Sequence, residues 1–349
     1  MLALPAAPRC RPGRLLAAIA FVALGTGGCY LGHVAAGQAR LLCARQSLES
    51  VIAAADTPAD LREKLRLVQS ARSFAARLGL KVDDQFTSYV PWEGDRVVTI
   101  VVATRPGEVD PAGYWFPFVG SVPYKGFFDP QRAETEAGRQ RSCSRDVCVV
   151  GVAAYSTLGW LDDPVTQPML RHGEGRLVDT ILHELVHATV YVSGAARFNE
   201  GVANFIGAEG SVRFFSERGD SERARRRRAS VDDDRQIGAV LAGLRADLRE
   251  LYASLEPGAQ RDAERRALAK RARAALRALP LETLDPARVA REARLNDACL
   301  ALRGTYSDDL DDYARLLAQL DGDLRAFLQR VLVAADAPDP GAALATGSL

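Results

Sequence analysis

The sequence has almost no surplus of charge of one sign and very few histidines. Its 349 residues include 45 lysines and arginines against 44 aspartates and glutamates, a formal net charge of +1. Without an overall field of one sign, there is no reason to expect nucleic acid or acidic membrane lipid as the main partner. Because only four histidines are present, two of them at a regular spacing would be informative.

The chain also has no apolar run long enough to span a bilayer. The N-terminal run from Leu15 to about Leu24 is far shorter than the ~20 residues that a transmembrane helix needs. It follows three arginines, at positions 9, 11 and 14. A basic segment followed by a short apolar run is typical of a signal peptide.

The end of this run, Leu24-Gly25-Thr26-Gly27-Gly28-Cys29, resembles the lipobox of bacterial lipoproteins. The resemblance implies a signal peptide at 1–28, lipidation of Cys29 and a lipid anchor in the bacterial cell envelope. Tyr30 is not the aspartate that marks inner-membrane retention, so the resemblance implies the outer membrane, facing the periplasm. Because Thr26 departs from the usual leucine, cleavage without lipidation near residues 34–36 is the alternative.

Four cysteines would remain after this processing, in an oxidising compartment where an even number favours disulfides. Cys143 and Cys148 are close enough in sequence for a local bridge. Cys43 with Cys299 would then join the two ends of the chain. The alternative is four buried thiols that pack as small hydrophobic side chains.

The spacing of apolar residues predicts an α+β protein. A helix is expected at about 58–78, where Thr57-Pro58 is a typical start and Gly79 a typical end. β-branched runs predict strands at 97–102 and 147–155, and the aromatic-rich stretch 111–130 predicts a packed loop region beside the sheet. After residue 177 the apolar spacing is helical.

These patterns divide the chain into consecutive parts. The dense charge at 218–235 is typical of a solvated helix face or hinge, and a nucleic-acid patch is the less favoured interpretation. The predicted parts are a signal peptide (1–28), N-terminal helices (29–80), a core of sheet and helices (81–217), a helical C-terminal region (218–336) and a disordered tail (337–349).

Two of the four histidines lie one helical turn apart in the segment 177–191. His183 and His187 are at positions i and i+4, so both imidazoles can reach one zinc ion at ~2.0–2.1 Å. Glu184 lies about 100° around the helix, where its carboxylate would face the attacking water rather than the metal. The alternative is a pair of buried histidines satisfied by hydrogen bonds.

A catalytic zinc site usually takes a third protein ligand, which must come from further along the chain. Gly194 is placed to end the first helix, and Glu200 would lie on the first turns of the next one. Asn204, one turn later, could accept a hydrogen bond from an imidazole N–H. Glu209 is the alternative third ligand, unless it is a salt-bridged surface carboxylate.

The pattern His183-Glu184-x-x-His187 followed by Asn199-Glu200-Gly201 resembles the gluzincins, whose third zinc ligand is a glutamate on the next helix. The interval from His187 to Glu200 is shorter than in thermolysin, and the chain has no Gly-x-Met-Glu-Asn segment for binding a substrate amine. A closer resemblance, over most of residues 29–335, is to a family of bacterial lipoproteins known as predicted aminopeptidases. It is carried by the segments 67–75, 123–129 and 155–160.

The resemblance implies a gluzincin-like, thermolysin-like catalytic core in which a small sheet is followed by a mostly helical half. It also implies a zinc-dependent peptidase that acts on a peptide or protein. Glu184 would move the proton from water to the leaving amine. Tyr155 and Tyr306 are candidate donors to the oxyanion, or simply packed tyrosines. The strand at 149–155 is a candidate for binding the substrate backbone.

An aminopeptidase needs an acidic group that binds the free amine of its substrate. Family analogy favours an aminopeptidase, with an endopeptidase as the alternative. A third hypothesis is a non-catalytic lipoprotein scaffold that keeps the fold, although a structural zinc site would not need Glu184. The carboxylates available for the amine are Asp162, Asp163, Glu174 and Glu209.

Overall fold

The computed structural model describes residues 28–116, 120–153, 162–307 and 310–346. Apart from Gly28, the expected signal peptide therefore lies outside the described residues, as does the whole segment 155–160 with Tyr155. Cys29 lies in the first turn of helix α2 (Gly28–Cys43). No helix in the described ranges combines the length and apolar character that crossing a membrane requires.

A three-stranded antiparallel sheet forms the centre of the molecule. Strand β3 (Val98–Thr104) is buried along its whole length and lies between β6 (Lys125–Phe127) and β7 (Asp146–Val152). Helix α5 (Pro130–Ser142) packs on one face of the sheet, and α11 (Asp297–Ser307) packs on the other. Among the described strands β7 pairs only with β3, so it is an edge strand of this sheet.

The stretch 111–130, expected to be a packed loop, contains three strands. Two of them, β4 (Tyr114–Phe116) and β5 (Gly120–Val122), form a hairpin, and β6 joins the central sheet. Each strand has only three residues, too few for a visible alternation of polar and apolar side chains. The loop prediction was wrong for this reason.

A second small sheet, formed by β1 (Gln46–Ser47), β2 (Ser88–Val90) and β8 (Val165–Thr166), belongs with two helices and a 3-10 turn. The helix predicted at 58–78 is α4 (Ala59–Leu78), which ends at Gly79 in the left-handed conformation that glycine adopts without strain. The other helix is α3 (Leu48–Ala53), and the 3-10 turn lies at Met169–Arg171.

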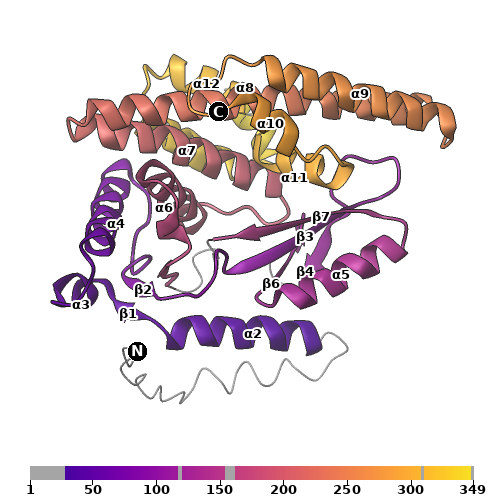
Figure 1. The fold of residues 1–349 in the computed structure, drawn as a ribbon. Helices are drawn as coiled ribbons and strands as arrows, with labels where there is room; N and C mark the ends of the chain where they lie inside the picture. Colours follow the sequence, from indigo (N-terminus) through magenta and orange to yellow (C-terminus); the bar gives the residue numbers. More distant parts are fainter. Residues whose placement is uncertain (1–27, 117–119, 154–161, 308–309, 347–349) are drawn as a thin grey trace.

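The second half of the chain is helical, as expected. Helices α6 (Glu174–Thr189) and α7 (Ala196–Glu217) pack side by side, with α4 against α6 and α8 (Ser221–Ser254) against α7. Figure 1 shows α7 and α8 above the sheet, α4 and α6 to its left and α2 below it. The remaining helices are α9 (Ala259–Ala278), α10 (Pro286–Glu292), α12 (Leu310–Gln319), α13 (Leu324–Ala334) and α14 (Pro340–Thr346).

The charged run at 218–235 is not simply a solvated face. Most of it forms the first turns of α8, but Arg227 and Asp233 are buried. Arg227 binds Asp179 of α6, and Asp233 accepts hydrogen bonds from the backbone N–H groups of residues 282–284. These buried charges are paired, as the cost of burial requires, and they attach α8 to its neighbours.

Two further expectations were wrong. The tail is not disordered at 340–346, because α14 packs there and buries Leu344 completely against the main core. The disulfide joins Cys148 to Cys299, so neither expected bridge forms. Cys148 lies on the sheet face that α11 covers, next to Cys299, whereas Cys143 is exposed at the end of α5.

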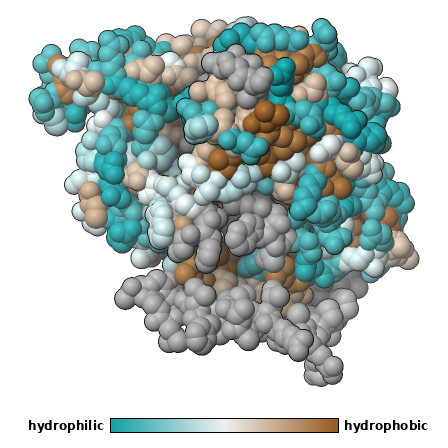
Figure 2. All heavy atoms as spheres, turned by 180° about the vertical axis from the view of Figure 1, so that it is seen from behind, coloured by the Kyte–Doolittle hydropathy of each residue, from teal (hydrophilic) through white to brown (hydrophobic). Residues whose placement is uncertain are grey.

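The outer surface is mixed in character. In the rear view of Figure 2, hydrophilic surface predominates over the described residues, and hydrophobic surface gathers in the upper middle of the view. Trp115 of the β4–β5 hairpin is the most exposed large apolar side chain in the described part, at 72%. Scattered apolar side chains of this kind are ordinary for a folded protein.

Candidate metal centre

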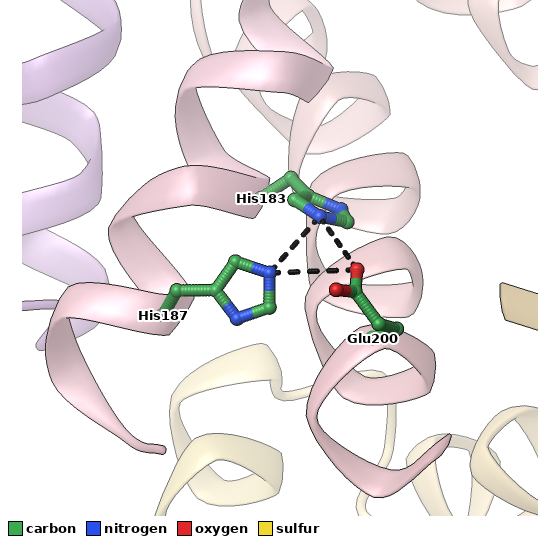
Figure 3. A group of neighbouring side chains, drawn as sticks. All are labelled: His183, His187 and Glu200. Atoms are coloured by element: carbon green, nitrogen blue, oxygen red, sulfur yellow. Dashed lines mark hydrogen bonds and ion pairs between the residues drawn. The ribbon is translucent and has the colours of Figure 1, made fainter. Parts of the chain in front are cut away.

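Helix α6 has one apolar face and one face that carries the metal-binding residues. Leu177, Ile181 and Leu185 are fully buried against the core. His183 and His187 follow the other face, one turn apart, and Figure 3 shows both imidazoles pointing toward the carboxylate of Glu200 on α7. The local pattern of the sequence therefore fixes which side of α6 meets the site.

The three side chains converge with the spacing of a tetrahedral metal site. Their closest approaches are 3.2 Å between the Nε2 atoms of His183 and His187, and 3.4 and 3.5 Å from these atoms to Oε2 of Glu200. Three donors bound tetrahedrally at zinc distances lie roughly 3.3–3.5 Å apart. Two imidazoles and a carboxylate are also the donor set of many catalytic zinc sites, so these residues fit a metal ion of that type.

Glycines on α7 bring it close enough to α6 for this convergence. A Cβ atom at Gly207 would lie 2.5 Å from Oδ1 of Asp179 and 3.3 Å from the Cβ of His183. A Cβ at Gly210 would lie 2.7 Å from Cδ1 of Leu182. Any larger residue would push the helices apart, so both glycines serve the close packing of the two helices that hold the ligands.

The site favours positive charge. Burial opposes the charged form of His183, but the carboxylates of Glu200 and Glu184 outweigh it and raise the pKa of this imidazole to about 9. Burial also opposes the charged form of Glu200, yet the two histidines lower its pKa. Both shifts have the direction expected of a site built to bind a cation.

Two buried polar atoms of the metal ligands and Glu184 have no hydrogen-bond partner within the described part of the chain. They are Oε2 of Glu184 and Nδ1 of His187. Glu184 lines the cavity beside the metal ligands, so its carboxylate is available to a water molecule or a substrate. A buried carboxylate oxygen without a hydrogen bond lowers the stability of the fold. A role of Glu184 as a proton acceptor would explain why this cost is tolerated.

Two tyrosines lie beside the ligands. The ring of Tyr306, from α11, stacks on His183 with the centroids 6.4 Å apart, and the hydroxyl of Tyr124 donates to Oε1 of Glu200 at 3.4 Å. The carboxylate of Glu200 together with burial raises the pKa of Tyr124, and burial together with that carboxylate raises the pKa of Tyr306. Both phenols therefore stay protonated and can donate hydrogen bonds.

Tyr124 was not among the predicted site residues. It follows β5 and lies in the segment 123–129 that carries the family resemblance, which was the available signal. Tyr306, which was predicted, does lie at the site. Nothing follows for Tyr155, since it is outside the described residues.

Asn204 does not contact an imidazole as predicted. Its Nδ2 donates to the backbone carbonyl of Tyr306 at 3.0 Å, so this amide binds α11 instead of α6. The position one turn after Glu200 faces α11, the helix that covers the sheet. The sequence alone did not indicate this contact. Asn204 thereby helps to position Tyr306 next to His183.

The alternative third ligand, Glu209, lies elsewhere. Its carboxylate accepts hydrogen bonds from Arg228, at 3.0 Å, and from Arg235, both on α8. It is nine residues beyond Glu200, about 13 Å along an α-helix. Glu209 is thus a paired carboxylate at the contact of α7 and α8.

The proposed amine-binding carboxylates are also absent from the site. Glu174 pairs with Arg223 at 2.7 Å, and neither Asp162 nor Asp163 lines the cavity. Among the described residues that line it, Glu184 and Glu200 are the only acidic ones. The structure therefore shows no separate acidic group for a substrate amine in its described part.

The metal ligands line a cavity of about 530 Å³. This volume is typical of a small-molecule or short-peptide site. Apart from the polar groups near the ligands, its walls are apolar. The walls come from α2, the central sheet and the β4–β5 hairpin: Tyr30, Leu31, Val34, Val98, Ile100, Phe116, Val122, Phe128 and Val152.

The edge strand β7 is less open than the sequence suggested. The carbonyl of Val147 accepts from Asn296 at 3.1 Å, that of Val149 from Arg294 at 2.7 Å, and that of Ala153 from Thr166 at 2.9 Å. Gly151, between them, is exposed. Among the described residues, the outer edge of β7 is therefore least covered near this glycine, and addition of a substrate strand there stays a prediction.

The fold and the site together define a mixed α and β protein with a candidate metal centre of two histidines and a glutamate. Residues 29–342 match the family model described as "Putative aminopeptidase", and the chain belongs to this family. No curated protein and no solved structure matches the chain. Family membership agrees with the resemblance found in the sequence and makes peptides the expected substrates.

Proposed function

We propose that this protein is a zinc-dependent peptidase of the gluzincin type. The observation that carries the proposal is the convergence of His183, His187 and Glu200 at 3.2–3.5 Å, with the buried carboxylate of Glu184 beside them. The family description supports peptides as substrates. A small sheet beside the two metal-binding helices is what a thermolysin-like core would require.

The residues of the site have distinct roles in this proposal. When bound, zinc would polarise the scissile carbonyl and make water a stronger acid. Glu184 takes the proton of the attacking water and passes it to the leaving amine. The protonated hydroxyls of Tyr124 and Tyr306 can donate to the oxygen that gains negative charge. The apolar walls exclude other water from the reaction.

Metal analysis of purified variants tests this proposal. Wild type reconstituted with zinc should bind one equivalent, His183→Ala should lose it, and Glu184→Gln should keep it without turnover. His172→Ala is a matched control, because this histidine lines the same cavity but lies outside the ligand set. A wild type that binds no stoichiometric zinc would refute the proposal. Zinc-loaded protein that cleaves no peptide in a broad library would favour the scaffold.

Within this function we favour an aminopeptidase, on the strength of the family description. One observation favours an endopeptidase as the second candidate, namely that Glu184 and Glu200 are the only carboxylates among the described cavity residues. Mass spectrometry of peptides with free and acetylated N-termini separates the two. An aminopeptidase removes single residues from the free peptides alone, whereas equal internal cleavage of both sets identifies an endopeptidase.

We also propose that the protein is a lipoprotein anchored through Cys29 in the cell envelope, at the outer membrane. Contacts of α2 support cleavage before Cys29 rather than near residues 34–36. The hydroxyl of Tyr30 donates to the carbonyl of Gly126 at 3.0 Å, and Nε2 of His33 accepts the backbone N–H of Phe128 at 3.1 Å. Cleavage after these residues would remove both contacts. Labelling with a radioactive fatty acid should mark wild type but not Cys29→Ser.

A further inference from the structure

Helix α2 forms one wall of the cavity that holds the metal centre. Tyr30, Leu31 and Val34 line the cavity from this helix. Their spacing places them on one face, while Ala36 is exposed on another. Figure 1 shows α2 running along the side of the molecule opposite to α8 and α9. The helix that carries the expected lipid anchor in its first turn therefore also lines the candidate active site.

This wall is firmly attached. The ring of Tyr30 packs against Phe127 and Phe116, with centroids 5.3 and 5.9 Å apart, in addition to its hydrogen bond to the sheet. At Gly37 the helix passes so close to Phe128 that a Cβ atom would lie 2.1 Å from the ring. These contacts hold the face with Leu31 and Val34 at a fixed distance from the sheet.

The lining of the cavity has a polar part, here called the polar end, which comes mainly from α6 and α7, and an apolar part, here called the apolar end, which comes from α2, the sheet and the hairpin. The metal ligands, Glu184 and the two tyrosines form the polar end, where the reaction is proposed to occur. Besides Val34 and Leu31, the apolar end is lined by aliphatic and aromatic side chains of the sheet and the hairpin. The described lining contains no lysine or arginine, and its only carboxylates are those of Glu184 and Glu200.

These chemical properties select among substrate side chains. A charged side chain in the apolar end would lose its hydration and gain no ionic partner from the described lining. A large apolar side chain would bury its surface there, whereas alanine would leave much of the space unused. Such a difference in buried surface corresponds to about 10- to 100-fold in kcat/KM.

We propose that α2 is the specificity wall of the peptidase, and that Val34 and Leu31 set the size of a pocket for a large apolar side chain next to the scissile bond. The inference rests on the proposed peptidase function and names its substrate class: peptides with leucine-like or phenylalanine-like residues at the cleaved position. It also makes residues 28–43 part of the active enzyme rather than a spacer.

Peptides that differ only at the residue beside the scissile bond test the inference on zinc-loaded protein. Wild type should cleave the leucine and phenylalanine peptides about 10- to 100-fold faster, in kcat/KM, than the alanine, lysine and glutamate peptides. Val34→Phe should fill the pocket, lowering kcat/KM for the large residues by about tenfold or more and sparing alanine. The matched control Ala36→Phe adds the same ring to the exposed face and should keep the wild-type preference.

Zinc content and thermal stability are measured for each variant, so that misfolding is recognised. Val34→Ala, which introduces no clash, gives a second reading, because it should raise the relative rate for the bulkiest side chains. A wild type that prefers alanine or charged residues overturns the inference. The inference is also overturned if Val34→Phe, Val34→Ala and Ala36→Phe all keep the same preference among the peptides. Zinc-loaded wild type that cleaves none of these peptides, nor any in the broad library, overturns the proposed function itself and this inference with it.

Discussion

Replacing Gly207 with alanine would test whether the close contact of α6 and α7 holds the metal ligands in place. The added Cβ would lie 2.5 Å from Oδ1 of Asp179, 2.9 Å from its carbonyl oxygen and 3.3 Å from the Cβ of His183. The carboxylate of Asp179 cannot simply move away, because Arg227 holds it at 2.5 Å. The backbone oxygen can move only together with α6.

The expected size of the effect follows from two opposing contributions. Ordinary contacts between heavy atoms lie near 3.5 Å, so α7 would have to move by roughly 0.5–1 Å. Overpacking of this kind costs about 1–3 kcal/mol. Alanine gains about 1 kcal/mol over glycine inside a helix. The net loss is therefore up to about 2 kcal/mol, a decrease of several degrees in Tm for a chain of this size.

The effect on the metal should be larger than the effect on stability. Ligand distances in metal sites tolerate errors of only about 0.2 Å, and the displaced helices carry His183 on one side and Glu200 on the other. We expect zinc affinity to fall about tenfold or more. Thermal unfolding with and without zinc, together with competition against a chelator of known affinity, measures both quantities.

Gly243 provides the matched control, because it lies inside α8 with no atom within 4 Å of a Cβ placed there. Gly243→Ala should raise stability by about 0.5–1 kcal/mol and leave zinc affinity unchanged. If Gly207→Ala gives the same stability gain and the same zinc affinity as this control, the close contact is not what brings the ligands together, and the reasoning is refuted.

Three more variants probe other contacts. Asn204→Ala removes the hydrogen bond to the carbonyl of Tyr306, so it should keep its zinc and lower kcat about tenfold with little change in KM; loss of zinc in an elemental analysis would contradict this. Glu209→Gln should lower the free energy of unfolding at pH 7 by about 1–3 kcal/mol. Its arginine partners outweigh burial and hold the pKa of Glu209 below the usual 4.5, so this contribution is present above that pH and is lost in acid. Urea unfolding at pH 7 and at successively lower pH checks it, and a difference between wild type and Glu209→Gln that does not shrink as the pH falls below 4.5 would argue against the ion pair. Replacing both Cys148 and Cys299 with alanine opens a loop of 151 residues and should cost up to about 5 kcal/mol; an unchanged Tm in calorimetry would be inconsistent with that estimate.

Features that depend on local spacing could be predicted from the sequence. Two histidines one turn apart lie on one face of any α-helix, and the glutamate at position 200 follows after a turn too short to take it far away. Helix α4 was predicted within one residue at its start because its end signals, a proline and a glycine, are also local.

Features that depend on the packing of distant elements could not be predicted. Asn204 and Tyr306 meet because α11 covers the sheet, and the same packing pairs Cys148 with Cys299 across 151 positions. Glu209 meets its arginines only because α8 returns along α7. No spacing in the sequence records these encounters. The imidazole partner expected for Asn204 and the local bridge expected for Cys148 were therefore wrong, whereas the salt-bridged carboxylate weighed as the alternative for Glu209 agrees with its arginine partners.

The side chains that cover the outer edge of β7 affect whether two copies of the protein can associate through this edge. An unprotected edge strand is a template on which a second molecule can extend the sheet, and this is a route to aggregation. Arg294 and Asn296 already occupy two of the outward carbonyls of β7. In the described residues, only a short stretch around the exposed Gly151 is left uncovered, and this stretch offers too little length for two copies to join edge to edge.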